Sequence, residues 1–308
     1  MLDVFSITLP IFILIALGFL ATRLDAMSPS DCRAIGGFVL RFALPALIFK
    51  SLSQTPFATI LNVPYLTVYT VSSLVVFSAA FVLASWARPD DVSAQAIAAL
   101  GASSSNSGFV GYPIALLAVG SSASVALALS MATENVVIIP LALTFAELGR
   151  HQGESAWTIL ARLLGRLVRT PLIIAIFLGL VASLLGLKLP GPIVKSVDML
   201  AAASGAAALF AVGGGLVGLR VSGVGGDVAR IVPFKLFAHP IVVLFALRWT
   251  PHLDPMLAKA MLVFASAPML GVYPLLARQY GQERVGSAAL LVATAGAFVT
   301  MSLLLAAL

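Results

Sequence analysis

The stretch SSSNSGFVGYPIALLA, residues 103–118, is polar and glycine-rich in its first half and is interrupted by Pro113. It lies between two apolar runs that are long enough to be buried in lipid. Lipid offers no hydrogen-bond partners, so a polar or broken backbone at membrane depth is tolerated only where protein or a cavity surrounds it. This stretch is therefore a candidate site.

The composition is that of a membrane protein. Of 308 residues, 60% are hydrophobic and 10% are charged, whereas soluble domains carry about 25% charged residues. Apolar segments of about 20 residues, long enough to cross a bilayer, recur at 7–23, 33–52, 65–86, 95–118, 124–146, 168–187, 196–217, 231–249, 257–277 and 286–307. They lack the alternation typical of a transmembrane barrel. The sequence predicts an all-α integral membrane protein with ten transmembrane helices.

The net charge of +6 is explained by the distribution of basic residues along the chain. With the N-terminus outside, the inner loops hold Arg23, Arg33, Arg88, Arg150, Arg162, Arg166, Arg169, Arg220, Arg230, Arg278 and Arg284, and the outer loops hold Lys188, Lys195, Arg248 and Lys259. Basic loops mark the cytoplasmic side of a membrane. We therefore expect a multi-pass protein of the cell membrane with both termini outside, whose partner is the lipid bilayer and not nucleic acid.

The chain divides into two halves, 1–150 and 151–308, with five expected spans in each. A single offset aligns them without a gap, pairing Pro10 with Pro171, Gly18 with Gly179, Ser105 with Ser266, Tyr112 with Tyr273, Pro113 with Pro274, Gly120 with Gly281 and Thr133 with Thr294. A five-helix unit enters and leaves on opposite faces of the membrane, so its second copy must be inverted. This pattern predicts two inverted repeats.

In inverted-repeat carriers, the substrate lies near the midplane, where broken helices of the two repeats meet. The segments 95–118 and 257–277 are the matching pair here, because Pro113 and Pro274 interrupt them. A broken helix presents the N-terminus of its second half, with free N–H groups and about half a positive charge, to a cavity. Two such ends favour a small organic anion such as a carboxylate.

Three motifs carry a family resemblance: FVLRFALPALIF at 38–49, NSGFVGYP at 106–113 and PMLGVYPLLARQYG at 268–281. They resemble the auxin efflux carrier family, the plant PIN carriers and their bacterial relatives, some of which are described as malonate transporters. The resemblance implies a sodium/proton-antiporter-like or bile-acid-transporter-like fold in which helices four and nine cross. It also implies scaffold and transport domains each drawn from both repeats, a homodimer formed through the scaffold, and elevator-type alternating access.

The family's polar residue before the first crossover falls on Asn106, and its crossover prolines fall on Pro113 and Pro274. The plant carriers have a second asparagine beside the second crossover, which this chain lacks, and this departure weighs against an auxin-like substrate. Ser266, Tyr273 or the backbone would have to replace that asparagine. The candidate substrate-binding residues are Asn106, Ser105, Ser107, Gly108, Gly111, Tyr112, Pro113, Ser266, Gly271, Tyr273 and Pro274. The alternative for the small polar residues is a role in helix contacts.

Glu134 is the one acidic residue deep in an expected span. An acid at mid-membrane costs about 2.5–3.5 kcal/mol on insertion scales, so something should compensate it. Glu134, with Thr133 and Asn135, could bind a coupling ion, H⁺ or Na⁺; the alternative is a structural acid held by hydrogen bonds. Arg41, near the centre of 33–52, could face Glu134 or an anionic substrate, or form a buried structural pair.

Three further basic side chains lie in apolar runs. We expect Lys50 and Lys235, close to span ends, to extend to the membrane surface, as long basic side chains do. His239 is expected to make a hydrogen-bonded contact between helices.

The sequence contains no HExxH, GxSxG or P-loop motif and no pair of acids within spans, which argues against an enzyme. The single cysteine, Cys32, offers no basis for a metal site, and no cofactor is expected. The sequence thus favours a secondary active or facilitative carrier of a small mono- or dicarboxylate, malonate-like or auxin-like. The alternative is an anion-selective channel or uniport pore.

Overall fold

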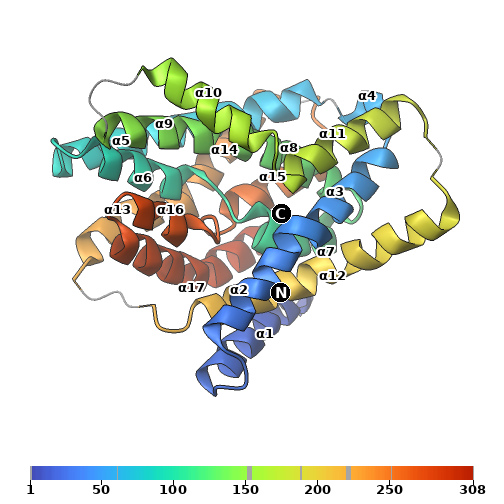
Figure 1. Cartoon of the computed structure of the whole chain (residues 1–308), viewed down its shortest axis with the longest axis horizontal. Helices are drawn as coiled ribbons and strands as arrows, with labels where there is room; N and C mark the ends of the chain where they lie inside the picture. Colours follow the sequence, from blue (N-terminus) through green and yellow to red (C-terminus); the bar gives the residue numbers. More distant parts are fainter. Residues whose placement is uncertain are drawn as a thin grey trace.

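The structure, a computed structural model, describes residues 2–60, 62–150, 155–187, 189–219, 223–250 and 252–307, without the side chains of 2–8, 58 and 59. The described residues are helical, with short links and no strand (Figure 1). The expectation of an all-α protein is confirmed. Lys188 and Arg220, which entered the expected charge bias, lie outside the described residues.

The first half of the chain contains α1 (Leu2–Arg23), α2 (Pro29–Phe38), α3 (Leu44–Ser53), α4 (Phe57–Ile60), α5 (Val63–Ala87), α6 (Val92–Ser103), α7 (Tyr112–Val119), α8 (Ser122–Thr133) and α9 (Ile139–Arg150). The second half contains α10 (Ala156–Leu167), α11 (Pro171–Leu184), α12 (Gly191–Gly215), α13 (Gly225–Pro233), α14 (His239–Leu247), α15 (Pro255–Ser266), α16 (Tyr273–Gln279) and α17 (Glu283–Ala307). Each of the apolar segments expected from the sequence falls on one of these helices or on a consecutive pair.

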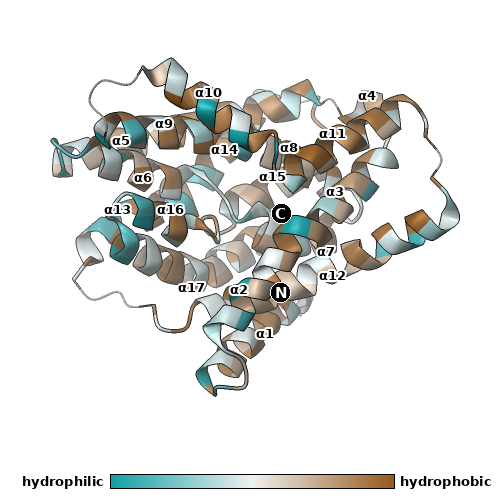
Figure 2. Ribbon diagram, viewed as in Figure 1, coloured by the Kyte–Doolittle hydropathy of each residue, from teal (hydrophilic) through white to brown (hydrophobic). Residues whose placement is uncertain are grey.

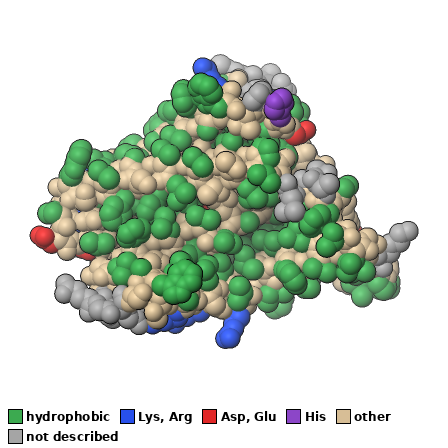
Figure 3. All heavy atoms as spheres, turned by 90° about the horizontal axis from the view of Figure 1, so that it is seen from above, with side chains coloured by type: hydrophobic (Ala, Val, Ile, Leu, Met, Phe, Trp, Pro, Cys, Tyr) green, Lys and Arg blue, Asp and Glu red, His purple; other side chains and the backbone are tan. Residues whose placement is uncertain are grey.

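Several helices are long and apolar enough to cross a membrane. Among the described residues, six continuous helices meet the length and composition of a span: Pro29–Ser53, Val63–Ala87, Ser122–Arg150, Gly191–Gly215, Gly225–Leu247 and Glu283–Ala307. The pair α10 and α11, bent by 69°, makes a seventh if it is counted as one span. Hydrophobic residues predominate along the helices (Figure 2). On the face drawn in Figure 3, the charged side chains lie towards the edges. The protein is therefore a multi-pass membrane protein.

In the part of the chain that the structure describes, four π-helical turns interrupt the helices at Val39–Ala43, Ser107–Gly111, Glu134–Ile138 and Phe234–Ala238. Each is followed after one residue by a proline: Pro45, Pro113, Pro140 and Pro240. Proline has no N–H for the usual bond and its ring clashes with the preceding turn, so the helix widens there by one residue.

Both stretches predicted to be broken are broken. α6 ends at Ser103, residues 104–106 are not helical, and the chain resumes through the π-helical turn into α7. In the second half, α15 ends at Ser266 and the next helix, α16, begins at Tyr273. Each segment thus consists of two short helices, and the helix ends at the break lie inside the protein.

The helices pack in two groups, each drawn from both halves of the chain (Figure 1). α1, α2, α3, α11 and α12 form one group, and α5, α6, α8, α9 and α13 to α17 form the other; α7 contacts both, and α3 with α8 and α1 with α17 join the groups directly. Gly18 of α1 packs against the backbone of α12 at Phe210, and Gly179 of α11 packs against Leu52 of α3. A Cβ at either glycine would clash, so these helices approach as closely as small residues allow.

α10 lies in the link between the halves, where no helix was expected from the sequence. It packs against α9 with Ile159 buried, while Trp157, Arg162 and Arg166 are exposed. The apolar and charged residues lie on different faces, so the helix is amphipathic. The arginines interrupt the apolar run of this segment, so the sequence does not show it as a membrane span.

Candidate functional site

The two broken segments meet at Asn106. Its backbone N–H donates a hydrogen bond of 2.7 Å to the carbonyl oxygen of Pro268, in the gap between α15 and α16. Gly271, in the same gap, lies beside the Asn106 side chain, since a Cβ there would be 3.4 Å from Asn106 Nδ2, an ordinary contact distance. The polar stretch around Asn106 therefore lies directly against its counterpart in the second half of the chain.

The Asn106 side chain carries a donor without a partner. The side chain is 5% exposed, and its Nδ2 makes no hydrogen bond to any residue that the structure describes. A buried donor left unpaired costs about 1–3 kcal/mol, so such groups are rare unless something else binds them. An oxygen atom of a ligand would satisfy this group.

The serines around Asn106 divide into two kinds. Ser103, Ser104 and Ser266 donate to carbonyl oxygens four residues earlier in their own helices. Ser105 and Ser107 instead bond to side chains of other helices. The polar stretch is therefore not a uniform binding surface. Only the side chains of Asn106, Ser105 and Ser107 are not bonded to the backbone of their own segment.

Glu134 lies next to this stretch, 1% exposed, at the start of a π-helical turn. Its Oε1 accepts hydrogen bonds from Ser107 Oγ at 2.7 Å and from the hydroxyl of Tyr69, in α5, at 2.9 Å. Two donors on one oxygen match a carboxylate, which only accepts. These bonds compensate the buried acid.

Thr133 and Asn135 do not join Glu134. Thr133 Oγ1 is paired with Thr70 Oγ1 at 3.0 Å, and Asn135 Nδ2 donates to the carbonyl oxygen of Met131 at 2.8 Å. Adjacent residues on a helix point in different directions, so the three side chains that are consecutive in sequence do not share one site.

Lys235 reaches the same cluster from the second half of the chain, and the expectation that it extends to the membrane surface is wrong. Its side chain is fully buried. Nζ donates to Ser105 Oγ at 2.6 Å and to the carbonyl oxygen of Ala265 at 2.9 Å, and lies 2.8 Å from His239 Nδ1. The side chain points inward because these acceptors are there, whereas the lipid side offers none.

His239 makes the helix contact that was expected of it. Its Nε2 lies 3.0 Å from Ser73 Oγ of α5, and its Nδ1 faces Lys235 one turn earlier. Since an ammonium only donates, Nδ1 must accept from it, and the ring proton is then on Nε2, directed at Ser73.

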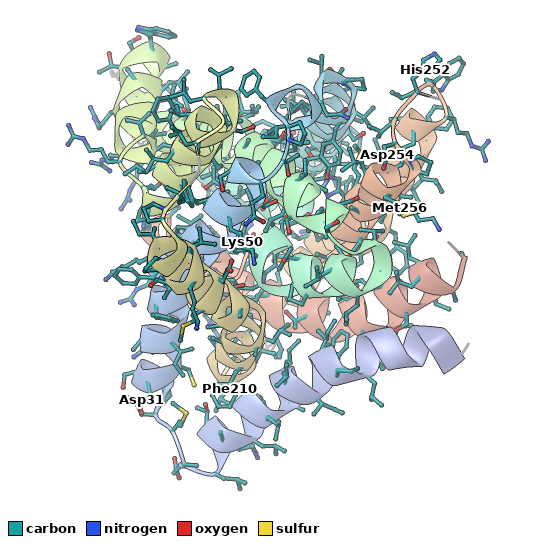
Figure 4. All side chains as sticks on the ribbon, turned by 90° about the vertical axis from the view of Figure 1, so that its right-hand side faces the viewer. Asp31, Lys50, Phe210, His252, Asp254 and Met256 are labelled. Atoms are coloured by element: carbon teal, nitrogen blue, oxygen red, sulfur yellow. The ribbon has the colours of Figure 1, made fainter. Side chains whose placement is uncertain are left out.

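Tyr112 and Pro113 line a cavity of about 380 Å³ between α7 and the helices α1, α3 and α12. The cavity also contains Lys50 of α3, labelled in Figure 4, and Asp198 of α12. Lys50 Nζ lies 2.7 Å from Asp198 Oδ1, and both side chains are partly exposed. Lys50 was expected to extend to the membrane surface; instead its ammonium is paired within this cavity.

The remaining candidate residues pack the crossing. A Cβ at Gly111 would lie 2.7 Å from the Phe264 ring, and one at Gly108 would lie 2.9 Å from Leu44 Cδ2. Tyr273 donates to the carbonyl oxygen of Ile97 at 3.0 Å, and Pro274 is half-buried beside it. The second half therefore offers its backbone at the crossing, since the Ser266 and Tyr273 hydroxyls are engaged elsewhere.

Arg41 lies apart from this cluster. It sits in the first π-helical turn with its side chain exposed on the surface of the chain. Glu134 is buried and bonded to Tyr69 and Ser107, so Arg41 is not its partner.

Sequence reasoning missed Tyr69, the inward orientation of Lys235 and the pair formed by Lys50 with Asp198. One signal was present for Lys235: His239 follows four residues later, so both lie on the same face of a helix. Two polar side chains on one face of an apolar run indicate a buried polar contact.

The model of the family described as "Membrane transport protein" matches residues 3–305, nearly the whole chain. The chain belongs to this family of membrane transporters. The resemblance to the auxin efflux carriers is thereby confirmed.

Curated relatives match the chain over nearly their whole length. The chain is 29% identical over 307 residues to a protein of Rhizobium meliloti (strain 1021) named "Putative malonate transporter", covering 99% of this chain and 96% of that protein. It is 25% identical over 300 residues to the "Uncharacterized transporter YfdV" of Escherichia coli (strain K12), covering 96% and 94%. These names describe transporters and point away from an enzyme.

Proposed function

We propose that this membrane transporter is a secondary active or facilitative carrier of a small carboxylate, which binds at the crossing of the two broken segments. The observation that carries the proposal is the unpaired, buried Asn106 Nδ2 at that crossing. A carboxylate oxygen is a strong acceptor, and hydrogen bonds to charged groups are worth about 1.5–3 kcal/mol.

The cavity beside the crossing supports an anionic substrate. It is bounded by Tyr112 and Pro113 on one side and by the Lys50–Asp198 pair on the other. A volume of about 380 Å³ accommodates a small organic acid. An incoming carboxylate would compete with Asp198 for the Lys50 ammonium, which favours substrates with a negative charge.

Ten spans in two inverted repeats, 1–150 and 151–308, are part of the proposal. The matching breaks in the two halves support it, as do the matching glycine contacts of Gly18 and Gly179. The helix group containing α1, α3 and α12 would serve as the scaffold and homodimer surface, and the group containing the crossing would move. This is elevator-type alternating access, with the substrate held at the crossing throughout.

A dicarboxylate such as malonate is the first substrate to test, because the relative from Rhizobium meliloti is named for it. The missing second asparagine makes an auxin-like substrate the less favoured of the two alternatives. H⁺ or Na⁺ coupling remains part of the proposal through Glu134, which lies one hydrogen bond from the serine after Asn106.

Thermal stabilisation of the detergent-purified protein tests the substrate class, because a ligand that binds only the folded state raises its stability. Malonate, other dicarboxylates, monocarboxylates and an auxin are compared with neutral and cationic analogues at constant ionic strength. We expect a saturable rise in melting temperature with a carboxylate. A rise with neutral or cationic compounds alone would contradict an anionic substrate.

A further inference from the structure

The crossing contains a second feature that the carboxylate site does not use, namely the buried ammonium of Lys235. The first helix of each broken segment, α6 in one and α15 in the other, ends beside this ammonium. Ser105, which accepts from Nζ, comes two residues after the end of α6, and Ala265, whose carbonyl accepts from Nζ, is the penultimate residue of α15. The last carbonyl groups of a helix lack intrahelical partners and carry about half a negative charge, which attracts cations.

In transporters with broken helices, such C-terminal ends and unwound carbonyls hold the coupling cation. Here an ammonium fills that position. Its three N–H groups find three acceptors, Ser105 Oγ, the Ala265 carbonyl and His239 Nδ1, at 2.6–2.9 Å. Within the described residues no hydrogen-bonding capacity of Nζ is left for an ion or water.

The counter-charge is also in place. Glu134 is joined to Ser105 through the Tyr69 hydroxyl, which lies 2.9 Å from Glu134 Oε1 and 3.3 Å from Ser105 Oγ. Among the described residues, the titratable groups that face the cluster are Glu134, Tyr69, Tyr65 and His239, and Glu134 is its one carboxyl group. One carboxylate and one ammonium make the cluster neutral without a metal ion.

We propose that Lys235 is a resident cation that occupies the coupling-cation position of this carrier, so that the protein neither binds nor requires sodium and, of the two coupling ions H⁺ and Na⁺, only H⁺ remains for Glu134. Its position also explains how anion binding at Asn106 is supported, because Lys235 holds the adjacent residue, Ser105, and places a positive charge beside the site. The inference rests on the proposed carrier function, but its first test needs no transport substrate.

The test measures thermal stability in NaCl against N-methyl-D-glucamine chloride at equal ionic strength, with KCl as a second reference. The wild type is expected to melt at the same temperature in all three. Lys235→Ala removes the ammonium and leaves Glu134, Ser105 Oγ and the Ala265 carbonyl around a vacant position. This variant should be less stable without sodium and should gain a sodium-specific rise of about 2 °C or more.

The matched control is Lys235→Met combined with Glu134→Gln, which removes both charges and should show no sodium response. If Lys235→Ala does not yield folded protein, the melting temperature of the wild type in sodium and in N-methyl-D-glucamine still tests the inference, with the neutral variant as the reference. A sodium-specific stabilisation of the wild type, or a folded Lys235→Ala protein that melts equally in sodium and N-methyl-D-glucamine, would overturn the inference.

Transport separates this inference from the carrier function. Carboxylate uptake by the wild type in liposomes should be unchanged when external sodium is replaced by N-methyl-D-glucamine. Uptake that is lost on this replacement would overturn the resident-cation inference and leave the carrier function standing. Absence of uptake in both media would count against the carrier function, whereas the stability test of Lys235 would keep its meaning.

Discussion

Asn106 differs from the serines on either side of it in the chain in having a buried donor without a partner among the described residues. Ser103, Ser104 and Ser266 satisfy their hydroxyls within their own helices, which is the least costly arrangement for a serine in an apolar environment. A group that is left unpaired where its neighbours are paired indicates a binding position, because the same cost is removed when a ligand binds.

Replacing Asn106 with alanine should therefore weaken binding without unfolding the protein. We expect affinity for the carboxylate to fall by about 10-fold or more, the effect of losing a hydrogen bond to a charged group. The melting temperature without ligand should not fall, because Nδ2 has no partner to lose. Isothermal titration and thermal melts measure the two quantities.

Asn135→Ala is the matched control, since that amide is half-buried and donates only to the Met131 carbonyl of its own helix. It should leave affinity unchanged. Equal affinity of Asn106→Ala and the wild type would assign Asn106 to helix packing instead.

The sequence could place Asn106 at the crossing because proline and glycine act locally on the backbone. It could not place Lys235 or Tyr69, because their partners are distant in the chain: Tyr69 is 65 residues from Glu134, and Lys235 is 130 residues from Ser105. A lysine near a span end reads the same whether it points to water or to the interior, and only the arrangement of helices decides between them.

At the scale of helices, the four π-helical turns share a cause and a consequence. A proline follows each turn, and each turn contains one of the polar residues Arg41, Ser107, Glu134 and Lys235. A widened turn rotates the side chains on either side of it and frees backbone groups, which is why such turns are common at functional sites. The prolines were visible in the sequence, but the change of helix type that they cause was not predicted.

The close contact of α1 with α12 gives a prediction about stability. A Cβ at Gly213 would clash with the Ile15 carbonyl, whereas Gly215, in the same helix, has open space around it. Gly213→Ala should destabilise the protein by about 1–3 kcal/mol, the usual cost of overpacking. Gly215→Ala should be neutral or slightly stabilising, because alanine is the better helix former. Thermal melts in detergent compare the two, and an equal effect of both changes would contradict the packing described here.

At the scale of the whole molecule, the cavity that contains Lys50 and Asp198 lies between α7, which carries the crossing, and α1, α3 and α12 of the first helix group. Most contacts lie within each group, and the groups are joined where α3 packs on α8, α1 on α17 and α12 on the π-helical turn Ser107–Gly111. This arrangement suits a carrier better than a channel, because the crossing itself is closed: Asn106 and the serines beside it are buried.

The proposed ten spans also predict an orientation. An even number of spans puts both termini on one side of the membrane, and the basic bias puts that side outside. In right-side-out membrane vesicles, an added protease should cleave tags placed at either terminus and should spare a tag inserted in the link at 151–154. Protection of one terminus but not the other would exclude an even number of spans, and protection of both would reverse the orientation.

Uptake of labelled malonate and related carboxylates by purified protein in liposomes tests the central claim most directly. The account predicts uptake that saturates with substrate concentration, is inhibited by unlabelled carboxylate, and is reduced in Asn106→Ala but not in Asn135→Ala. Linear, non-saturating flux with single-channel steps would favour the anion channel, and absence of uptake of any organic acid under any imposed gradient would contradict the account.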